Sequence, residues 1–171
     1  WTDVITSGGV SFIGNVLDDR IPGFLSISEV SDGTVFDRNI ITTGGDYCRI
    51  RLGNYCKADG NVINKTSPDV VPYQASTIIC GNGCQILNNR AAQIVFRNRC
   101  VITGNVLGDA IWQWDNDDQS EVIIKGNEIG KMSGYGPPYN AYNGFSVIGL
   151  FSYSIIEGNS LGGTFSCTRS P

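Results

Sequence analysis

Carboxylates are the acid and base candidates of this sequence, because its 171 residues include no histidine. That absence excludes Ser-His-Asp and Cys-His catalysis and any imidazole base. Asp37 and Asp59 occupy equivalent positions in two copies of a repeated phrase. If such copies stack as adjacent strands, the two residues lie about 5 Å apart at Cα, near the carboxyl spacing of retaining glycosidases. We take both as candidate catalytic residues, although a solvated acidic surface explains them more simply.

Trp112 and Trp114 alternate within the segment 111–118 (IWQWDNDD), so on a strand their rings share one face. On an outward face they would offer apolar surface to sugar rings, with Asp115 and Asp117 accepting hydroxyl hydrogen bonds. The same rings could instead cover the domain or fill a subunit interface. The acidic run could also hold a calcium ion through oxygen ligands, but it lacks the spacing of an EF-hand loop.

Two segments break the regular pattern of the chain and are expected to be loop insertions, at 66–73 and 131–145. The second places Tyr135 and Tyr139 among Gly and Pro residues. Tyr and Pro together make a comparatively rigid, amphipathic surface, and projecting loops often carry function. We therefore expect Tyr135 and Tyr139 to contact a glycan or a neighbouring subunit, and not to catalyse.

The six cysteines do not indicate a metal site. Cys56, Cys84 and Cys100 fall in one apolar column of the repeat, where Cys behaves as a small hydrophobe. Neighbouring strands would be close enough for a disulfide, but we expect buried, reduced thiols. Cys80 and Cys84 have the spacing of half a zinc site, yet there is no histidine and no second close pair. No metal or cofactor is predicted.

One phrase, of the form hxhxGNxh, recurs seven times along the chain, where h is an apolar residue. The copies align on Asn15, Asn39, Asn61, Asn89, Asn105, Asn127 and Asn159, with a mean spacing of 24 residues. A fixed period in this range is typical of stacked repeats. Apolar or small residues stand five and three positions before the Asn and two after it, whereas the position two before it is mixed. That alternation predicts strands with one inward face.

The Gly-Asn step predicts a sharp corner, because Gly and Asn tolerate a positive φ most easily. Stacked Asn side chains can also hydrogen-bond from one repeat to the next. The intervals are uneven, and the 16 residues between Asn89 and Asn105 are short for a full turn of chain. We therefore expect that the alignment at Asn89 could be shifted in register.

Composition limits the partners of the chain. Charged residues make up 16% of it and the net charge is −4, with a pI near 4.7. No basic cluster stands out, so nucleic acid is not an expected partner. No stretch is apolar for the roughly 20 residues that a membrane helix needs. Because the chain begins at Trp1 and not at Met, we expect a processed product or part of a longer chain.

These phrases resemble the parallel β-helix repeat of the pectate-lyase-like superfamily, and most closely the β-helical domains of bacteriophage tailspikes and tail fibres. The resemblance runs from about residue 10 to residue 162. It implies one all-β domain over residues 1–171, a right-handed parallel β-helix of about seven coils. It further implies a homotrimer in the phage tail that recognises a bacterial surface polysaccharide outside the cell. A carboxylate-based polysaccharide hydrolase, less readily a lyase, and a structural spacer are the alternatives.

Overall fold

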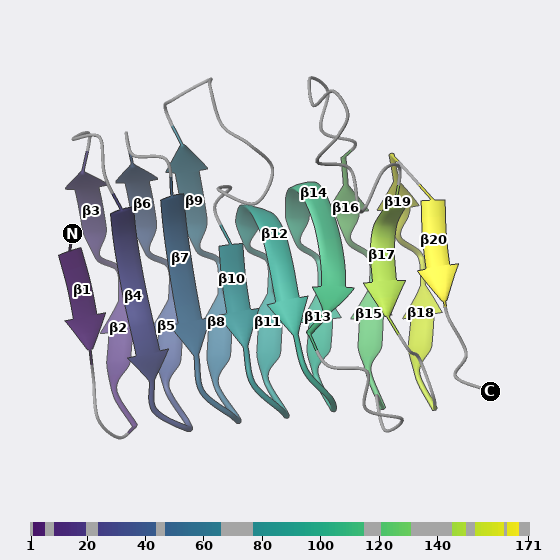
Figure 1. The fold of residues 1–171 in the computed structure, drawn as a ribbon, viewed down its shortest axis with the longest axis horizontal. Coiled ribbons are helices and arrows are strands. Elements are labelled where there is room, and N and C mark those ends of the chain that lie inside the picture. Colours follow the sequence, from purple (N-terminus) through teal and green to yellow (C-terminus); the bar gives the residue numbers. More distant parts are fainter. Residues whose placement is uncertain are drawn as a thin grey trace.

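The computed structural model describes residues 2–5, 9–19, 24–43, 47–65, 77–114, 121–130, 145–149, 153–162 and 164–167. Within these ranges the regular structure consists of 20 β-strands. The strands pair in parallel in two large sheets of 13 and seven strands (Figure 1). The predicted all-β class is therefore confirmed. The described residues form no helix of the length and hydropathy that crossing a bilayer requires.

The 13-stranded sheet consists of two rows of strands that meet at β12 and β14. The first row comprises β1 (Thr2–Ile5), β4 (Phe24–Val30), β7 (Tyr47–Leu52), β10 (Thr77–Cys80), β12 (Arg90–Phe96), β14 (Val106–Gln113), β17 (Phe145–Gly149) and β20 (Thr164–Cys167). The second row comprises β3 (Val16–Asp19), β6 (Ile40–Thr43), β9 (Val62–Lys65), the first residues of β12 and β14, and then β16 (Glu128–Ile129) and β19 (Ser160–Leu161).

The seven-stranded sheet contains the phrases that precede each aligned Asn. Its strands are β2 (Ser11–Ile13), β5 (Val35–Asp37), β8 (Lys57–Asp59), β11 (Gln85–Leu87), β13 (Val101–Thr103), β15 (Ile123–Lys125) and β18 (Ile155–Glu157). They are paired in sequence order, so equivalent positions of consecutive repeats lie side by side. In Figure 1 the first row of the larger sheet lies in front, and both β-sheets run from the N-terminal to the C-terminal strands along the long axis.

The aligned asparagines form one continuous ladder of hydrogen bonds from Asn15 to Asn159. The alignment at Asn89 is correct: its backbone N–H and its Nδ2 donate to Oδ1 of Asn105 over 2.9 and 3.0 Å. The interval after Asn89 is short because β12 runs directly from the second row into the first row of the sheet. A register shift between Ala91 and Gln93 marks the place where it does so.

The positive φ lies at the residue before each Asn and not at the Asn itself. Gly104 and Gly126 adopt φ of 68° and 61° there, and Asn88 and Arg38 both adopt 53°. An L side chain pays a conformational cost in this region, which explains the preference for Gly at the corner.

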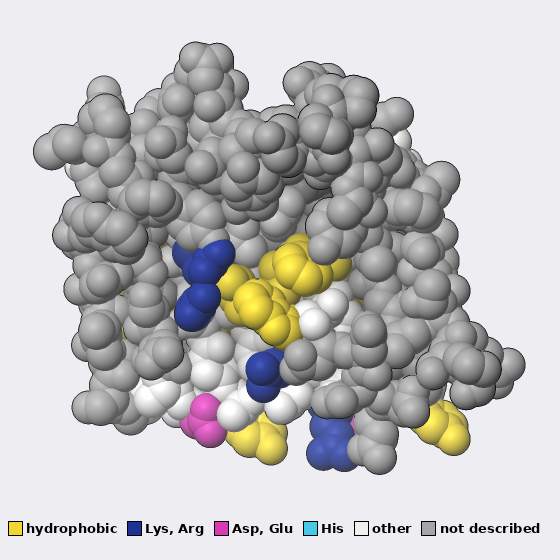
Figure 2. Space-filling view, in the orientation of Figure 1, with side chains coloured by type: hydrophobic (Ala, Val, Ile, Leu, Met, Phe, Trp, Pro, Cys, Tyr) yellow, Lys and Arg dark blue, Asp and Glu magenta, His cyan; other side chains and the backbone are white. Residues whose placement is uncertain are grey.

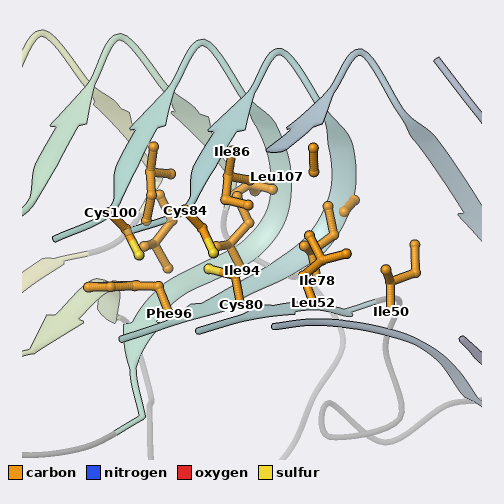
Figure 3. Close-up of a cluster of buried hydrophobic side chains, with 14 of the residues drawn as sticks. Ile50, Leu52, Ile78, Cys80, Cys84, Ile86, Ile94, Phe96, Cys100 and Leu107 are labelled. Atoms are coloured by element: carbon orange, nitrogen blue, oxygen red, sulfur yellow. The ribbon is translucent and has the colours of Figure 1, made fainter. Parts of the chain in front are cut away.

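The core lies between the sheets and is built from the predicted apolar columns. Ile86, Ile102 and Ile124 of the seven-stranded sheet and Ile94 of β12 are fully buried in it. Cys80, Cys84 and Cys100 lie in the same cluster (Figure 3). The five cysteines with described side chains are free and buried, as predicted. Cys167 lies in β20, and its side chain is outside the described residues.

The two predicted loop insertions fall almost entirely outside the described residues. Residues 66–73 and 131–144 are not described. Phe145, which we assigned to the second loop, is instead the first residue of β17 and pairs with Thr164.

Candidate functional site

The outward side of β7, β10, β12 and β14 carries the most distinctive surface among the described residues. Ile50, Ile78, Ile94 and Ile111 are paired across these four strands, and each is fully buried in the core. Because side chains alternate along a strand, the next residues face outward. That outward row is Arg51, Ile79, Val95 and Trp112, also paired strand to strand. We call the side of the sheet that carries this row the outer face.

Trp112 and Trp114 share the outer face, as their alternation predicted. Their ring centroids are 5.9 Å apart and their planes differ by 14°, so the indoles are stacked. Gln113, between them, points inward and donates from Nε2 to Oδ1 of Asn98 over 3.0 Å. Trp114 is 46% exposed. Two large rings thus lie beside each other on this face, that of Trp114 exposed and that of Trp112 partly exposed.

Val95 lies in the outward row but is covered. It is only 1% exposed, although it alternates with Ile94 and Phe96 and does not belong to the core cluster. Figure 2 shows a patch of hydrophobic side chains on this side of the molecule.

Arginines border the apolar patch. Arg49 and Arg51 alternate on β7, and the pKa of Arg49 is lowered by burial and by the positive charge of Arg51. Arg97 follows Phe96, whose carbonyl accepts the Trp114 N–H over 2.8 Å, so Arg97 and Trp114 lie at neighbouring positions of adjacent chain segments. In Figure 2 dark-blue side chains lie next to the apolar patch.

This basic group was not predicted from the sequence. No cluster of Lys or Arg stands out along the chain, because Arg97 is far from Arg49 and Arg51. One available signal was the Arg-Ile-Arg alternation at residues 49–51, which places two guanidinium groups on one face of any strand.

Rings and guanidinium groups together define what the outer face can bind. Indole faces stack on the apolar faces of sugars, and the planar guanidinium group binds carboxylate or phosphate through two parallel hydrogen bonds. None of the described side chains that share this face with Arg51 and Trp112 is acidic.

Asp37 and Asp59 lie on the other sheet, in register on β5 and β8 as predicted. Lys57 separates them: its Nζ is 3.2 Å from Oδ2 of Asp37 and 3.1 Å from Oδ2 of Asp59. The pKa of Asp59 is lowered by the hydrogen bond from Asn88 and then by Lys57, with burial opposing. A general acid needs a raised pKa. The catalytic role of this pair stays a prediction that the charge arrangement does not favour.

The remaining predicted site residues cannot be placed against the tryptophans. Asp115, Asp117, Tyr135 and Tyr139 lie outside the described residues. The Asp37–Asp59 pair belongs to the seven-stranded sheet and the Trp pair to the 13-stranded one. The structure therefore brings the predicted rings together without bringing the predicted catalytic acids to them.

The buried thiols form a second group of potentially reactive side chains. Burial raises the pKa of Cys48 to about 12. The pKa of Cys84 is raised by its hydrogen bonds to Cys100, Cys56 and Cys80, and further by burial. Within the described part of the chain, no three His, Cys, Asp or Glu side chains are grouped so as to hold a metal ion.

No family model matches the chain, and neither the curated proteins nor the solved structures yield a match. Its function is therefore inferred from the residues and contacts described above.

Proposed function

We propose that this chain is a right-handed parallel β-helix of about seven coils, from a bacteriophage tailspike or tail fibre, that recognises a bacterial surface polysaccharide during host attachment. The continuous Asn ladder and the ordered parallel pairing support the β-helix. Both features are expected where consecutive repeats lie on one another along a single axis. The proposal places the protein in the virion, acting outside the bacterial cell.

The stacked Trp112–Trp114 pair on the outer face carries the functional part of the proposal. Large apolar rings at a surface cost free energy in water unless a ligand or partner covers them. Sugars have an apolar face that matches an indole and hydroxyl groups that stay hydrated at its edge. A parallel sheet also holds such rings rigidly, so little entropy is lost when a glycan binds.

A homotrimer is part of the same proposal. On the outward side of the seven-stranded sheet, Ile123 and Ile155 are paired neighbours that are 36% and 51% exposed. Val101 precedes them in the same column and is partly exposed. Contact with another subunit would remove this apolar column from water. Sedimentation equilibrium of the purified chain would test the association directly.

Binding to a panel of purified bacterial surface polysaccharides tests the function, read out by calorimetry and by tryptophan fluorescence. We expect at least one polysaccharide to bind, and Trp114→Ala to weaken that binding by about tenfold, as loss of a stacked ring does. Tyr153→Asn is the matched control, because Tyr153 is an exposed aromatic residue outside the outer face and Asn tolerates its positive φ.

The same samples distinguish binding from cleavage. New reducing ends that disappear in Asp37→Asn or Asp59→Asn would favour the glycosidase alternative. Absence of binding across a broad panel would contradict the proposal and leave a structural spacer. Equal losses from Trp114→Ala and Tyr153→Asn would contradict the assignment of the outer face.

A further inference from the structure

Both sheets begin, at the N-terminal end of the molecule, with strands that are paired on one side. Among the described strands, β1 pairs only with β4, β2 only with β5 and β3 only with β6. The three strands belong to one repeat and lie together at the same end of the stack (Figure 1). We call their open side the N-terminal edge. An open strand edge is a template for pairing with another strand.

The hydrogen bonds of β2 show which of its backbone groups face the N-terminal edge. The Val10 carbonyl accepts an N–H from β5 over 3.0 Å, and the Gly14 N–H donates to a β5 carbonyl over 3.0 Å. Phe12 lies between them and faces the same way, because backbone groups alternate from side to side along a strand. The N–H and C=O groups of Ser11 and Ile13 therefore face the edge, where they have no partner among the described residues.

The side chains at this edge are apolar and accessible. Ile13 is 47% exposed and Val16 is 73% exposed. Phe12 is only partly buried, whereas Phe36, its equivalent in the next repeat, is 1% exposed. The two rings lie 6.0 Å apart, so a further apolar group on the open side of Phe12 would complete its burial. Strand β2 also contains no charged residue and no proline, which are the residues that commonly protect an open edge.

We propose that the N-terminal edge binds a second copy of this chain, with the two β2 strands antiparallel about a two-fold axis at Phe12. In an antiparallel pair, opposite residues exchange both of their backbone hydrogen bonds at every second position. When the two Phe12 residues lie opposite each other, Ser11 of each copy lies opposite Ile13 of the other. Every open backbone group of β2 then gains a partner. The edge is complementary to itself, as an isologous two-fold interface requires.

The C-terminal end of the stack does not offer a matching surface. There β20 pairs with β17 and extends one strand beyond β18 and β19. If a second copy placed its β2 on β18, its β1 would need the position on β17 that β20 already occupies. Head-to-tail stacking, which builds open filaments, therefore requires a strand to be displaced. Pairing at the N-terminal edge requires no displacement and closes after two copies.

This contact is separate from the proposed glycan site and from the proposed trimer. The trimer would use the outward side of the seven-stranded sheet, at Ile123 and Ile155, whereas this contact uses the end of the same sheet. The two contacts can therefore exist together. A two-fold axis at Phe12 joins two monomers into a dimer, or two trimers end to end into a hexamer.

Sedimentation equilibrium of the purified chain over a range of concentrations tests the proposal. We expect the wild type to form a dimer or a hexamer. Ile13→Pro should raise the dissociation constant of the two-fold contact by about tenfold or more, because it removes hydrogen bonds from both copies. Proline keeps every hydrogen bond to β5, since the N–H of residue 13 faces the edge. Hydrogen exchange at Ser11 and Ile13 should slow as the concentration rises.

A matched pair of lysine variants keeps the test independent of proline. Ile13→Lys places a charge at the edge and should also weaken the two-fold contact. Val106→Lys is the control: Val106 is 45% exposed, close to the 47% of Ile13, and it lies on β14, several repeats from the edge. Val106→Lys should leave the dissociation constant unchanged. Circular dichroism and urea unfolding check that each variant is folded.

The mass of a monomer or of a trimer at every concentration would overturn the inference, as would the growth of filaments. Equal effects of Ile13→Lys and Val106→Lys would overturn it too. Ile155→Lys distinguishes the two contacts, because it should convert a hexamer into a dimer and leave the two-fold contact intact. Glycan binding is measured separately, so its failure would remove the proposed function and leave this contact standing.

Discussion

Asn61 donates its backbone N–H and its side-chain Nδ2 to a single oxygen, Oδ1 of Asn89, over 3.0 and 2.8 Å. Asn89 in turn donates from Nδ2 to the carbonyl of Ala58 over 2.9 Å. Both asparagines are almost completely buried. Because Asn89 also donates to Oδ1 of Asn105, its amide satisfies groups in the preceding repeat and in the next one, which couples the register of neighbouring strands to the position of the Asn.

Asn89→Ala should destabilise the protein by about 3 kcal/mol or more, because it leaves two buried donors of Asn61 without their acceptor. Urea unfolding followed by circular dichroism measures the loss. Asn64→Ala is the control, since Asn64 is exposed on β9, and surface changes of this kind stay within about 0.5 kcal/mol. Equal losses from the two variants would show that the ladder contributes little to stability.

Two glycine substitutions distinguish the loss of stability caused by a steric clash from that caused by a strained backbone φ. A Cβ on Gly81 would lie 2.5 Å from Oδ1 of Asn54 and 2.8 Å from the Gly53 carbonyl oxygen. Gly126 has a φ of +61° and open space around the same position. We expect Gly126→Ala to lower the free energy of unfolding by about 1 kcal/mol, because alanine is strained at this positive φ. Gly81→Ala should cost more, because the backbone of the neighbouring repeat must shift. Thermal unfolding of both variants checks the order, and the reverse order would contradict it.

Lowering the pH should weaken the contacts between charged residues of the seven-stranded sheet. The pKa of Asp59 is lowered in the folded protein, first by Asn88 and then by Lys57. A lowered folded-state pKa contributes stability that is present above the unfolded value, about 3.9, and is lost as the pH falls through the folded value. The contribution is below about 1 kcal/mol, because both partners are partly exposed.

Unfolding free energies measured from pH 6 down to pH 2.5 test this dependence. Asp59→Asn should flatten the acid side of the profile relative to the wild type. Glu128→Gln is the comparison, because Glu128 is exposed and pairs with no described cation. If the two variants have the same profile, the Asp59 contacts do not contribute to acid stability.

The buried cysteines should resist alkylation in the native state. Burial raises the pKa of Cys48 to about 12, and Cys84 and Cys100 are fully buried. A thiol reacts as the thiolate and must be accessible. Iodoacetamide at pH 8 should therefore leave these three residues unmodified until urea unfolds the protein, as mass spectrometry of the peptides would report. Rapid labelling of Cys84 or Cys100 without denaturant would contradict the burial of the column.

The local pattern of residues was enough to predict much of the fold. Alternation around each Asn was enough to predict which residues face inward, because a strand has a period of two wherever it pairs. The Gly-Asn step predicted the corner for the same reason, since a positive φ is a local requirement. The short interval at Asn89 could not be understood locally: it depends on β12 continuing from one row of strands into the other, which lateral pairing decides.

The sequence by itself determined the aligned columns, the buried thiols and the shared face of Trp112 and Trp114, because each follows from alternation within one strand. Only the tertiary structure decided which residues of other strands lie beside them. It placed Lys57 between Asp37 and Asp59, and it brought Arg51 and Trp112 into one register across four strands. The intervals between repeats vary in length, so the partner of an outward residue depends on how whole repeats stack, and not on any spacing along the chain.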